Sequence, residues 1–225
     1  MSMVSERKEE MRIFHPEDVI ISDRSYNIVL GCTIGWGILL NIVLCVFCGN
    51  FVDSINPVVF LIGYFVCAFS GMFIAYKSDN PVISFIGYNM VVVPVGLVIA
   101  SVVSVYGGIG AEVVVYAFLF TMIITGCMIA LSIIYPRFFS RIGGLLLSAL
   151  FGLIICELVS VFFGFDNYWF AWVGAVIFSL YIGYDFYVSQ QYVKTIDNAI
   201  DSSVAIYLDI ANLFLKLLRI LGRRK

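Results

Sequence analysis

Residues 81–106 have the sequence PVISFIGYNMVVVPVGLVIASVVSVY, which contains no charged side chain. A helix that crosses the ~30 Å hydrocarbon core of a bilayer needs about 20 apolar residues, so this segment alone is long enough to span a membrane. Six further apolar stretches of similar length are separated by short connections that contain Pro, Gly or polar residues. We therefore expect seven transmembrane helices, at residues 27–49, 57–77, 81–106, 110–135, 141–163, 168–189 and 201–221.

The composition of the whole chain agrees with a lipid environment. Of its 225 residues, 62% are hydrophobic and only 12% are charged, and the mean hydropathy is +1.03. Soluble domains carry about 25% charged residues, so this chain has too few to cover a water-exposed surface. The net charge of −2 provides no basic field for nucleic acid. A soluble enzyme, a secreted disulfide scaffold and a disordered chain are all excluded.

The charged residues divide the chain into three parts. Residues 1–26 form a polar arm that lacks the apolar run of a signal peptide. Residues 27–222 form the seven-helix transmembrane domain, and residues 223–225 are a basic tail. The predicted fold class is an all-α integral membrane protein.

The basic residues predict the orientation in the membrane. They lie in the arm and in the second, fourth and sixth connections, whereas connections one, three and five have none. Because cytoplasmic segments carry the excess of Lys and Arg, the N-terminus is expected in the cytoplasm. The basic tail disagrees, since seven spans place it on the opposite side, and either the tail escapes this rule or the last segment does not fully cross. The residues that set the orientation are Arg7, Lys8, Arg12, Arg24, Lys77, Arg137, Arg141 and Lys194.

Cysteine and histidine offer little catalytic chemistry. All six cysteines fall inside apolar stretches, where buried free thiols are expected. The only histidine, His15, lies in the polar arm. A zinc site or a Ser-His-Asp triad within the helices is therefore not expected.

Three carboxylates remain at membrane depth, namely Glu157, Asp185 and Asp209. An Asp at the centre of a membrane helix costs about 2.5–3.5 kcal/mol on insertion scales, so such a residue is usually partnered or functional. The simpler alternative for each is a helix-end acid that reaches the interface, or a neutral acid that is hydrogen-bonded inside the bundle.

Asp185 and Asp209 are the strongest candidates for a functional pair. The helices expected at 168–189 and 201–221 run antiparallel through the connection around Lys194, which places both acids in the inner half of the membrane. Two carboxylates that meet in a poorly solvated site share one proton. The protonated pair would tie the two helices together, and the doubly charged pair would separate them or bind a cation. Tyr181, one turn before Asp185, and Asn212, near Asp209, are possible partners.

Glu157 is the third acid and lies toward the outer end of the helix expected at 141–163. The sequence offers no evident partner for it. It is interpreted either as a pore-lining acid or as a hydrogen-bonded structural residue.

The segment that contains the two aspartates resembles a known family. Residues 178–185 read FSLYIGYD and residues 206–222 read IYLDIANLFLKLLRILG. Together they are similar to the C-terminal signature of the Bax inhibitor (transmembrane Bax inhibitor motif) family, and a bacterial member is expected. The resemblance implies a seven-helix bundle whose last helix is central, a pH-sensitive calcium leak, and Asp185 and Asp209 as its sensor.

Two positions depart from the family pattern. Bacterial members have an arginine near the inner end of helix two, and this sequence has Lys77 there. A lysine can pair with the aspartates but lacks the bidentate geometry of a guanidinium. The family often has a glutamate in helix four, where this chain has Tyr116, with Glu112 one turn earlier.

The expected function is thus a passive calcium or cation leak gated by the aspartate pair, with Asp185 and Asp209 as the possible calcium ligands. The alternative is a non-conducting regulator that binds another membrane protein, such as a protease or a cell-death component. An intramembrane aspartyl protease is disfavoured, because Asp209 lacks a Gly-x-Gly-Asp context. We expect no enzymatic activity, no cofactor beyond calcium, and no nucleic-acid partner. The expected partners are calcium ions, protons and the bilayer. The expected location is a bacterial inner membrane, or the endoplasmic reticulum or Golgi membrane in a eukaryote.

Overall fold

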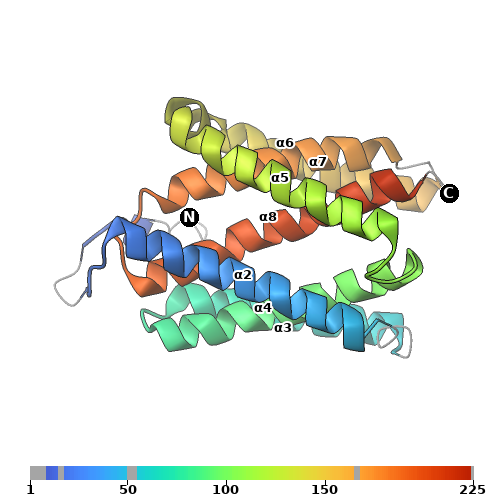
Figure 1. Cartoon of the computed structure of the whole chain (residues 1–225), viewed down its shortest axis with the longest axis horizontal. Coiled ribbons are helices and arrows are strands. Elements are labelled where there is room, and N and C mark those ends of the chain that lie inside the picture. The colour runs from blue at the N-terminus through green and yellow to red at the C-terminus, as the bar shows by residue number, and fades with distance from the viewer. Residues whose placement is uncertain (1–8, 15–17, 50–54, 165–167, 224–225) are drawn as a thin grey trace. The chain divides into compact units, whose positions relative to one another are not determined.

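The computed structural model describes residues 9–14, 18–49, 55–164 and 168–223, and in these ranges the chain is helical and has no β-strand. Seven long helices follow one another along the described part of the chain, as Figure 1 shows. Their bounds are α2 (Asp23–Phe47), α3 (Pro57–Lys77), α4 (Pro81–Val105), α5 (Glu112–Ile134), α6 (Pro136–Phe163), α7 (Tyr168–Ser189) and α8 (Ile196–Gly222).

Side-chain caps and prolines set where the helices begin. Ser22 caps α2 by accepting a hydrogen bond from the backbone N–H of Ser25 at 3.1 Å. Asn56 and Asn80 cap α3 and α4 in the same way, and each is followed by a proline at the first helical position. Proline is tolerated there because its missing N–H has no partner within the helix. These starts agree with the breakers in the sequence.

Three helices begin earlier than the apolar pattern predicts. α2 begins at Asp23 rather than 27, α6 at Pro136 rather than 141, and α8 at Ile196 rather than 201. Their first turns are polar or charged, so a search for apolar stretches does not include them. In α8 the cap is Thr195, whose hydroxyl accepts a hydrogen bond from Asn198 N at 3.1 Å.

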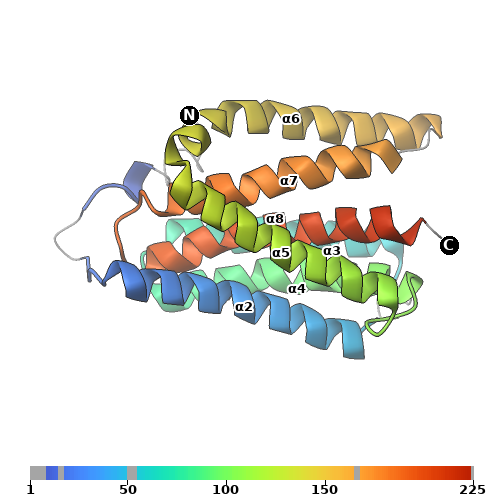
Figure 2. The same cartoon turned by 45° about the horizontal axis from the view of Figure 1, so that its top comes forward.

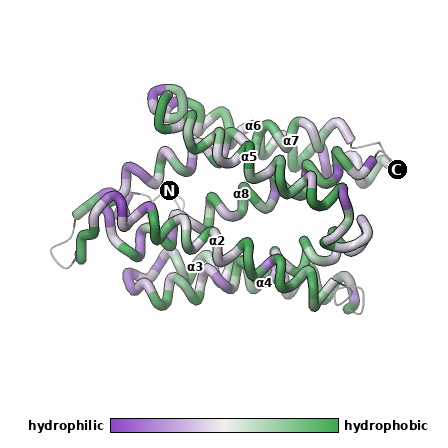
Figure 3. The backbone as a smooth tube through the Cα atoms, in the orientation of Figure 1, coloured by the Kyte–Doolittle hydropathy of each residue, from purple (hydrophilic) through white to green (hydrophobic). Residues whose placement is uncertain are grey.

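Six of the described helices, α2 to α7, are long and apolar enough to cross a membrane. Hydrophobic residues cover most of their length in Figure 3. Many large apolar side chains on these helices are exposed, for example Val66 in α3, Ile133 in α5 and Phe162 in α6. Such a surface is suited to lipid and not to water. α8 is not among the six, because acidic and basic residues interrupt its apolar run.

The chain divides into two compact units. The first comprises residues 1–109 and 189–207, and the second comprises residues 110–188 and 208–225. α8 therefore contributes its residues up to Tyr207 to the first unit and its residues from Leu208 onward to the second.

In the first unit, α4 packs against both α2 and α3. The backbones of α3 and α4 approach closely at Gly71 and Gly87, where each glycine faces the other helix without a side chain. Figures 1 and 2 both show these two helices side by side. The first half of α8 joins them through Ser84 of α4, whose hydroxyl donates to the Asp197 carboxylate at 2.7 Å.

In the second unit, α6 and α7 lie side by side in both views (Figure 2). The contact again depends on glycines. A Cβ atom on Gly183 of α7 would lie 2.4 Å from the Phe139 ring of α6, and one on Gly143 of α6 would lie 2.5 Å from the Tyr184 hydroxyl of α7. α5 contacts α6 in the same unit.

The cysteines differ from expectation in their exposure. All six are free thiols, as predicted, but none is buried, and Cys32, Cys127 and Cys156 are exposed on apolar helices. A small apolar thiol is as compatible with lipid as with a protein core, which explains the difference. His15 lies outside the described residues.

Candidate functional site

Asp185 and Asp209 both belong to the second unit. Asp185 lies four residues before the end of α7 and is partly buried. Asp209 lies 13 residues after the start of α8, about 20 Å along the helix at 1.5 Å per residue. It is deeper in its helix than the sequence predicts, because α8 starts five residues earlier. Its exposed fraction is 8%, so the protein largely shields it.

Tyr181 lies within electrostatic range of both aspartates. Its phenol lies close enough to both Asp185 and Asp209 to experience the charge of each carboxylate. Its ring also packs edge-on against the ring of Tyr184, with centroids 6.4 Å apart. Three of the residues that sequence reasoning selected thus lie in the same unit, with the tyrosine in electrostatic range of both acids.

Two further expected partners have other contacts. The side chain of Asn212 donates a hydrogen bond to the carbonyl of Leu208, one turn earlier in α8, at 2.8 Å. Lys77 is the last residue of α3 in the first unit, where its ammonium lies 5.4 Å from the centre of the Phe73 ring.

Glu157 has a partner that the sequence did not reveal. Its carboxylate forms an ion pair with the ammonium of Lys216, which joins α6 to α8 within the second unit. The sequence shows no evident partner for Glu157, and the structure supplies one. The residues are 59 positions apart, so no local spacing indicates the contact. The sequence did contain one indication of a partner for this acid. Lys216 and Arg219 are the only basic residues within the segment expected at 201–221.

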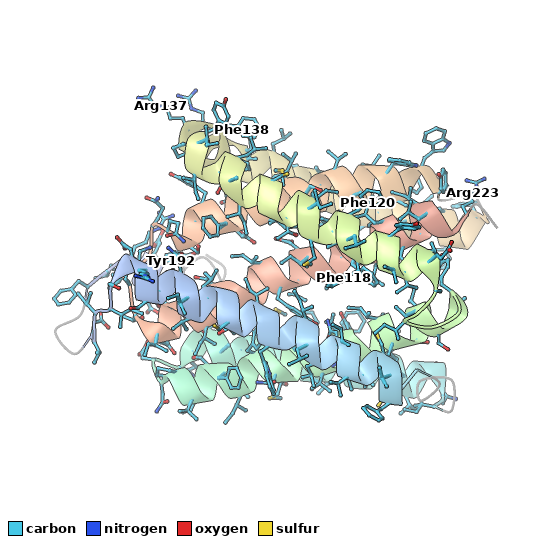
Figure 4. The ribbon with its side chains drawn as sticks, in the orientation of Figure 1. Phe118, Phe120, Arg137, Phe138, Tyr192 and Arg223 are labelled. Carbon is cyan, nitrogen blue, oxygen red and sulfur yellow. The ribbon has the colours of Figure 1, made fainter. Side chains whose placement is uncertain are left out.

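The second half of α8 runs antiparallel to α7 in a regular register. Asp209 is close to Tyr181, the side chain of Lys216 lies against Gly174, and the guanidinium of Arg223 lies 4.2 Å from the centre of the Tyr168 ring. Figure 4 labels Arg223 just past the end of α8. Asp209 and Lys216 are spaced seven apart, so they lie on one face of α8, and Arg223 follows directly after its last residue.

Two additional acids are buried in the first half of α8. Asp197 and Asp201 are 5% and 1% exposed. The expected helix bounds of 201–221 place Asp197 in the connection before the last helix and Asp201 at its edge. The structure corrects this placement. They are inside the helix because α8 begins at Ile196, and α4 covers Asp197 through the Ser84 hydrogen bond. A search for apolar stretches does not detect a first helical turn that consists of polar residues.

The connection between α7 and α8 is held by Tyr26 of α2 within the first unit. The Tyr26 hydroxyl donates to the carbonyl of Ser189 at 3.0 Å and lies 3.0 Å from the Ser202 hydroxyl. The ammonium of Lys194 sits 4.3 Å from the centre of the Tyr26 ring and donates to the carbonyl of Gln190 at 2.9 Å. Burial lowers the pKa of Lys194, and the negative charge of nearby Asp23 opposes this shift.

The polar arm is attached to the same connection. The backbone N–H of Val193 donates to the carbonyl of Met11 at 2.8 Å, and the N–H of Ile21 donates to the carbonyl of Lys194 at 2.8 Å. Met11 is only 4% exposed. The described part of the arm is therefore fixed to the segment that leads into α8.

The described residues contain no group of three or more His, Cys, Asp or Glu side chains placed to hold a metal ion. Long apolar helices together with buried acids at helix contacts define a polytopic integral membrane protein with polar groups in its interior.

Comparison with known proteins identifies the family. The model of the family described as "Inhibitor of apoptosis-promoting Bax1" matches residues 24–225, and the chain belongs to this family. An uncharacterized protein of Helicobacter pylori (strain J99) is 35% identical over 130 residues, which cover 56% of this chain and 52% of that protein. "Bax inhibitor 1" of Schizosaccharomyces pombe is 39% identical over 37% of this chain and 32% of its own length. The "BI1-like protein" of Arabidopsis thaliana is 38% identical over 37% and 33%. The matches thus span about half or less of these curated relatives.

Proposed function

We propose that this protein is a pH-sensitive passive leak for calcium ions, and that Asp185 and Asp209 form its sensor and gate. The observation that carries the proposal is the burial of Asp209 in α8 and of part of Asp185 in α7 of the same unit, with Tyr181 in electrostatic range of both carboxylates. Acids brought together inside an apolar bundle commonly mark an ion path or a proton site.

The proposed gate uses a shared proton. When the pair holds a proton, a hydrogen bond between the carboxyl groups ties α7 to α8 and closes the path. When both carboxylates are ionised, their repulsion separates the helices, or a cation binds between them. Tyr181 and Tyr184 of α7 are among the titratable neighbours of the pair, and Gly143 of α6 borders the Tyr184 hydroxyl.

Calcium fits this site by its chemistry. It prefers hard oxygen ligands, and carboxylates are the strongest that proteins offer. Asp185 and Asp209 supply two such groups, and backbone carbonyls and water would complete the shell. Calcium here is the transported species, and the role is not enzymatic. The residues before Asp209 are Ala205-Ile-Tyr-Leu rather than the Gly-x-Gly of an intramembrane aspartyl protease.

We further infer that α8 is a seventh, central span and that the N-terminus is cytoplasmic. α8 has 27 residues, about 40 Å at 1.5 Å per residue, so it is long enough to cross. Its first half contacts α2 and α4, and its second half contacts α6 and α7. The proposed location is a bacterial inner membrane, in line with relatives in Helicobacter and Borreliella.

Reconstitution into vesicles loaded with a calcium dye tests the function. Wild-type protein is expected to pass calcium, and the flux is expected to rise with pH as the pair loses its proton. Asp185→Asn and Asp209→Asn should lose most of this dependence. Asp79→Asn is the matched control, because Asp79 is exposed in the connection between α3 and α4. Absence of wild-type flux would rule out the function.

A second candidate is a non-conducting regulator of another membrane protein. The family description and the name of the yeast relative favour it, since both describe an inhibitor. Cross-linking in native membranes should then yield a stoichiometric partner, and calcium flux should be unchanged in cells that lack the gene.

A further inference from the structure

The ion pair between Glu157 and Lys216 lies inside the second unit, away from the helix ends. Glu157 is six residues before the end of α6, and Lys216 is six residues before the end of α8. Their side chains are 28% and 15% exposed. Both charges are thus partly removed from solvent, in helices where an isolated charge is costly.

The neighbouring helix leaves room for the lysine. A Cβ atom on Gly174 of α7 would lie 2.8 Å from Cε and 3.0 Å from Cδ of Lys216. The same atom would lie 3.2 Å from Leu153 of α6. The glycine therefore provides the space that the lysine stem fills, and three helices form the site.

The pair continues the face of α8 that carries the proposed gate. Lys216 follows Asp209 by seven residues, which is two helical turns or about 10.5 Å on the same face. Arg223, just past the end of α8, lies against the ring of Tyr168. Along this face the charge changes from negative to positive, and Glu157 is the acid that neutralises the first positive group.

Stability alone does not account for the pair. A partly buried ion pair gains little over apolar residues of similar volume, because removing both charges from water offsets their attraction. The position of the pair on the gate-bearing face suggests an electrostatic role instead.

We propose that Lys216 is a tethered counter-cation. Its ammonium pairs with the Glu157 carboxylate and thereby sets an electrostatic barrier to cations that move along this face of α8. This inference rests on the proposed cation leak. Glu157 attracts a permeating cation, Lys216 repels it and competes for the same carboxylate, and the balance of the two charges sets the height of the barrier.

The test compares two single variants in dye-loaded vesicles, at a pH at which the wild type conducts. Lys216→Met removes the resident cation and leaves Glu157 available, so calcium flux should rise. Glu157→Gln leaves the positive charge uncompensated, so flux should fall. We expect each change to be roughly tenfold or more, because a unit charge interacts strongly with a nearby ion in a poorly solvated site.

The matched controls remove the same charges elsewhere in the second unit. Arg137→Met acts at an exposed residue in the first turn of α6, which is labelled in Figure 4. Glu112→Gln acts at an exposed residue in the first turn of α5. Both should conduct as the wild type does, since neither lies on the face of α8 that carries the gate.

The opposite changes in calcium flux expected for the two single variants distinguish this proposal from a purely structural role. If the pair only holds α6 against α8, both single variants break the same link and change the flux in the same direction, and that result overturns the proposal. The double variant Glu157→Gln/Lys216→Met provides a second test if Lys216→Met does not fold. It should conduct more than Glu157→Gln alone, and equal or lower flux also overturns the proposal.

The same experiment distinguishes failure of the proposed leak from failure of the proposed role of Lys216. A wild type without calcium flux overturns both the leak and this inference. A wild type with pH-dependent flux, combined with single variants that change in the same direction, overturns only the role of Lys216.

Discussion

Tyr207 shows how polar side chains are accommodated inside the first unit. It is 1% exposed, and its hydroxyl lies 2.9 Å from Nδ2 and 3.1 Å from Oδ1 of Asn41. Its ring packs edge-on against Tyr88 at a centroid distance of 5.7 Å. Because Asn41 is itself buried, the tyrosine hydroxyl and the amide satisfy each other.

Tyr207→Phe should destabilise the protein by about 1–3 kcal/mol, because it leaves the buried amide of Asn41 without this partner. Thermal unfolding in detergent measures the change. Tyr116→Phe, at an exposed residue of α5, is the control and should unfold as the wild type does. Equal stability of the two variants would contradict the role of this hydrogen bond.

The sequence predicted individual site residues unevenly. Asp185 and Asp209 stand out because charged groups are rare in this chain, and Tyr181 was selected because it lies one turn before Asp185. The structure places the tyrosine in electrostatic range of both acids. The partner of Glu157 was missed. It depends on which helices pack together, and hydropathy contains no information about that pairing.

The helices themselves were largely predictable, since Pro, Gly and Asn mark their connections. The bounds of α3 and α7 agree with the expectation, whereas α8 starts five residues early because its first turn is polar. The close contact of α3 and α4 could not be predicted. It depends on two glycines, Gly71 and Gly87, that face each other only after the helices have packed.

Gly87→Ala should destabilise the first unit by about 2–3 kcal/mol, because overpacking a tight helix contact forces the backbones apart. The added Cβ atom would lie 2.6 Å from Ala75 N and from Gly71 O, and neither backbone atom can move easily. Gly63→Ala is the control, since nothing lies within 4 Å of its added atom. Thermal unfolding in detergent compares them, and a neutral Gly87→Ala would refute the close packing.

At the scale of the whole molecule, α8 determines the topology. Six described helices are apolar enough to span a membrane. α8 carries buried acids and two basic residues, so composition alone does not decide whether it crosses. If α8 crosses as the seventh span, the N- and C-termini lie on opposite sides of the membrane. If it does not cross, they lie on the same side.

Reporter fusions at the two ends distinguish these topologies. An enzyme that is active only in the cytoplasm should be active when fused before residue 1 and inactive when fused after residue 225. An enzyme that is active only outside the cytoplasm should give the reverse pattern. Cytoplasmic activity at both ends would show that α8 does not cross.

The central claim is that the Asp185 and Asp209 pair senses pH and gates a calcium leak. The most direct test is calcium flux measured against pH in vesicles that contain purified wild-type protein or Asp209→Asn. The wild-type flux should rise with pH, as loss of the shared proton separates α7 from α8. Asp209→Asn should give a low flux that changes little with pH, because an amide cannot ionise. A variant that retains the wild-type pH profile would contradict the account.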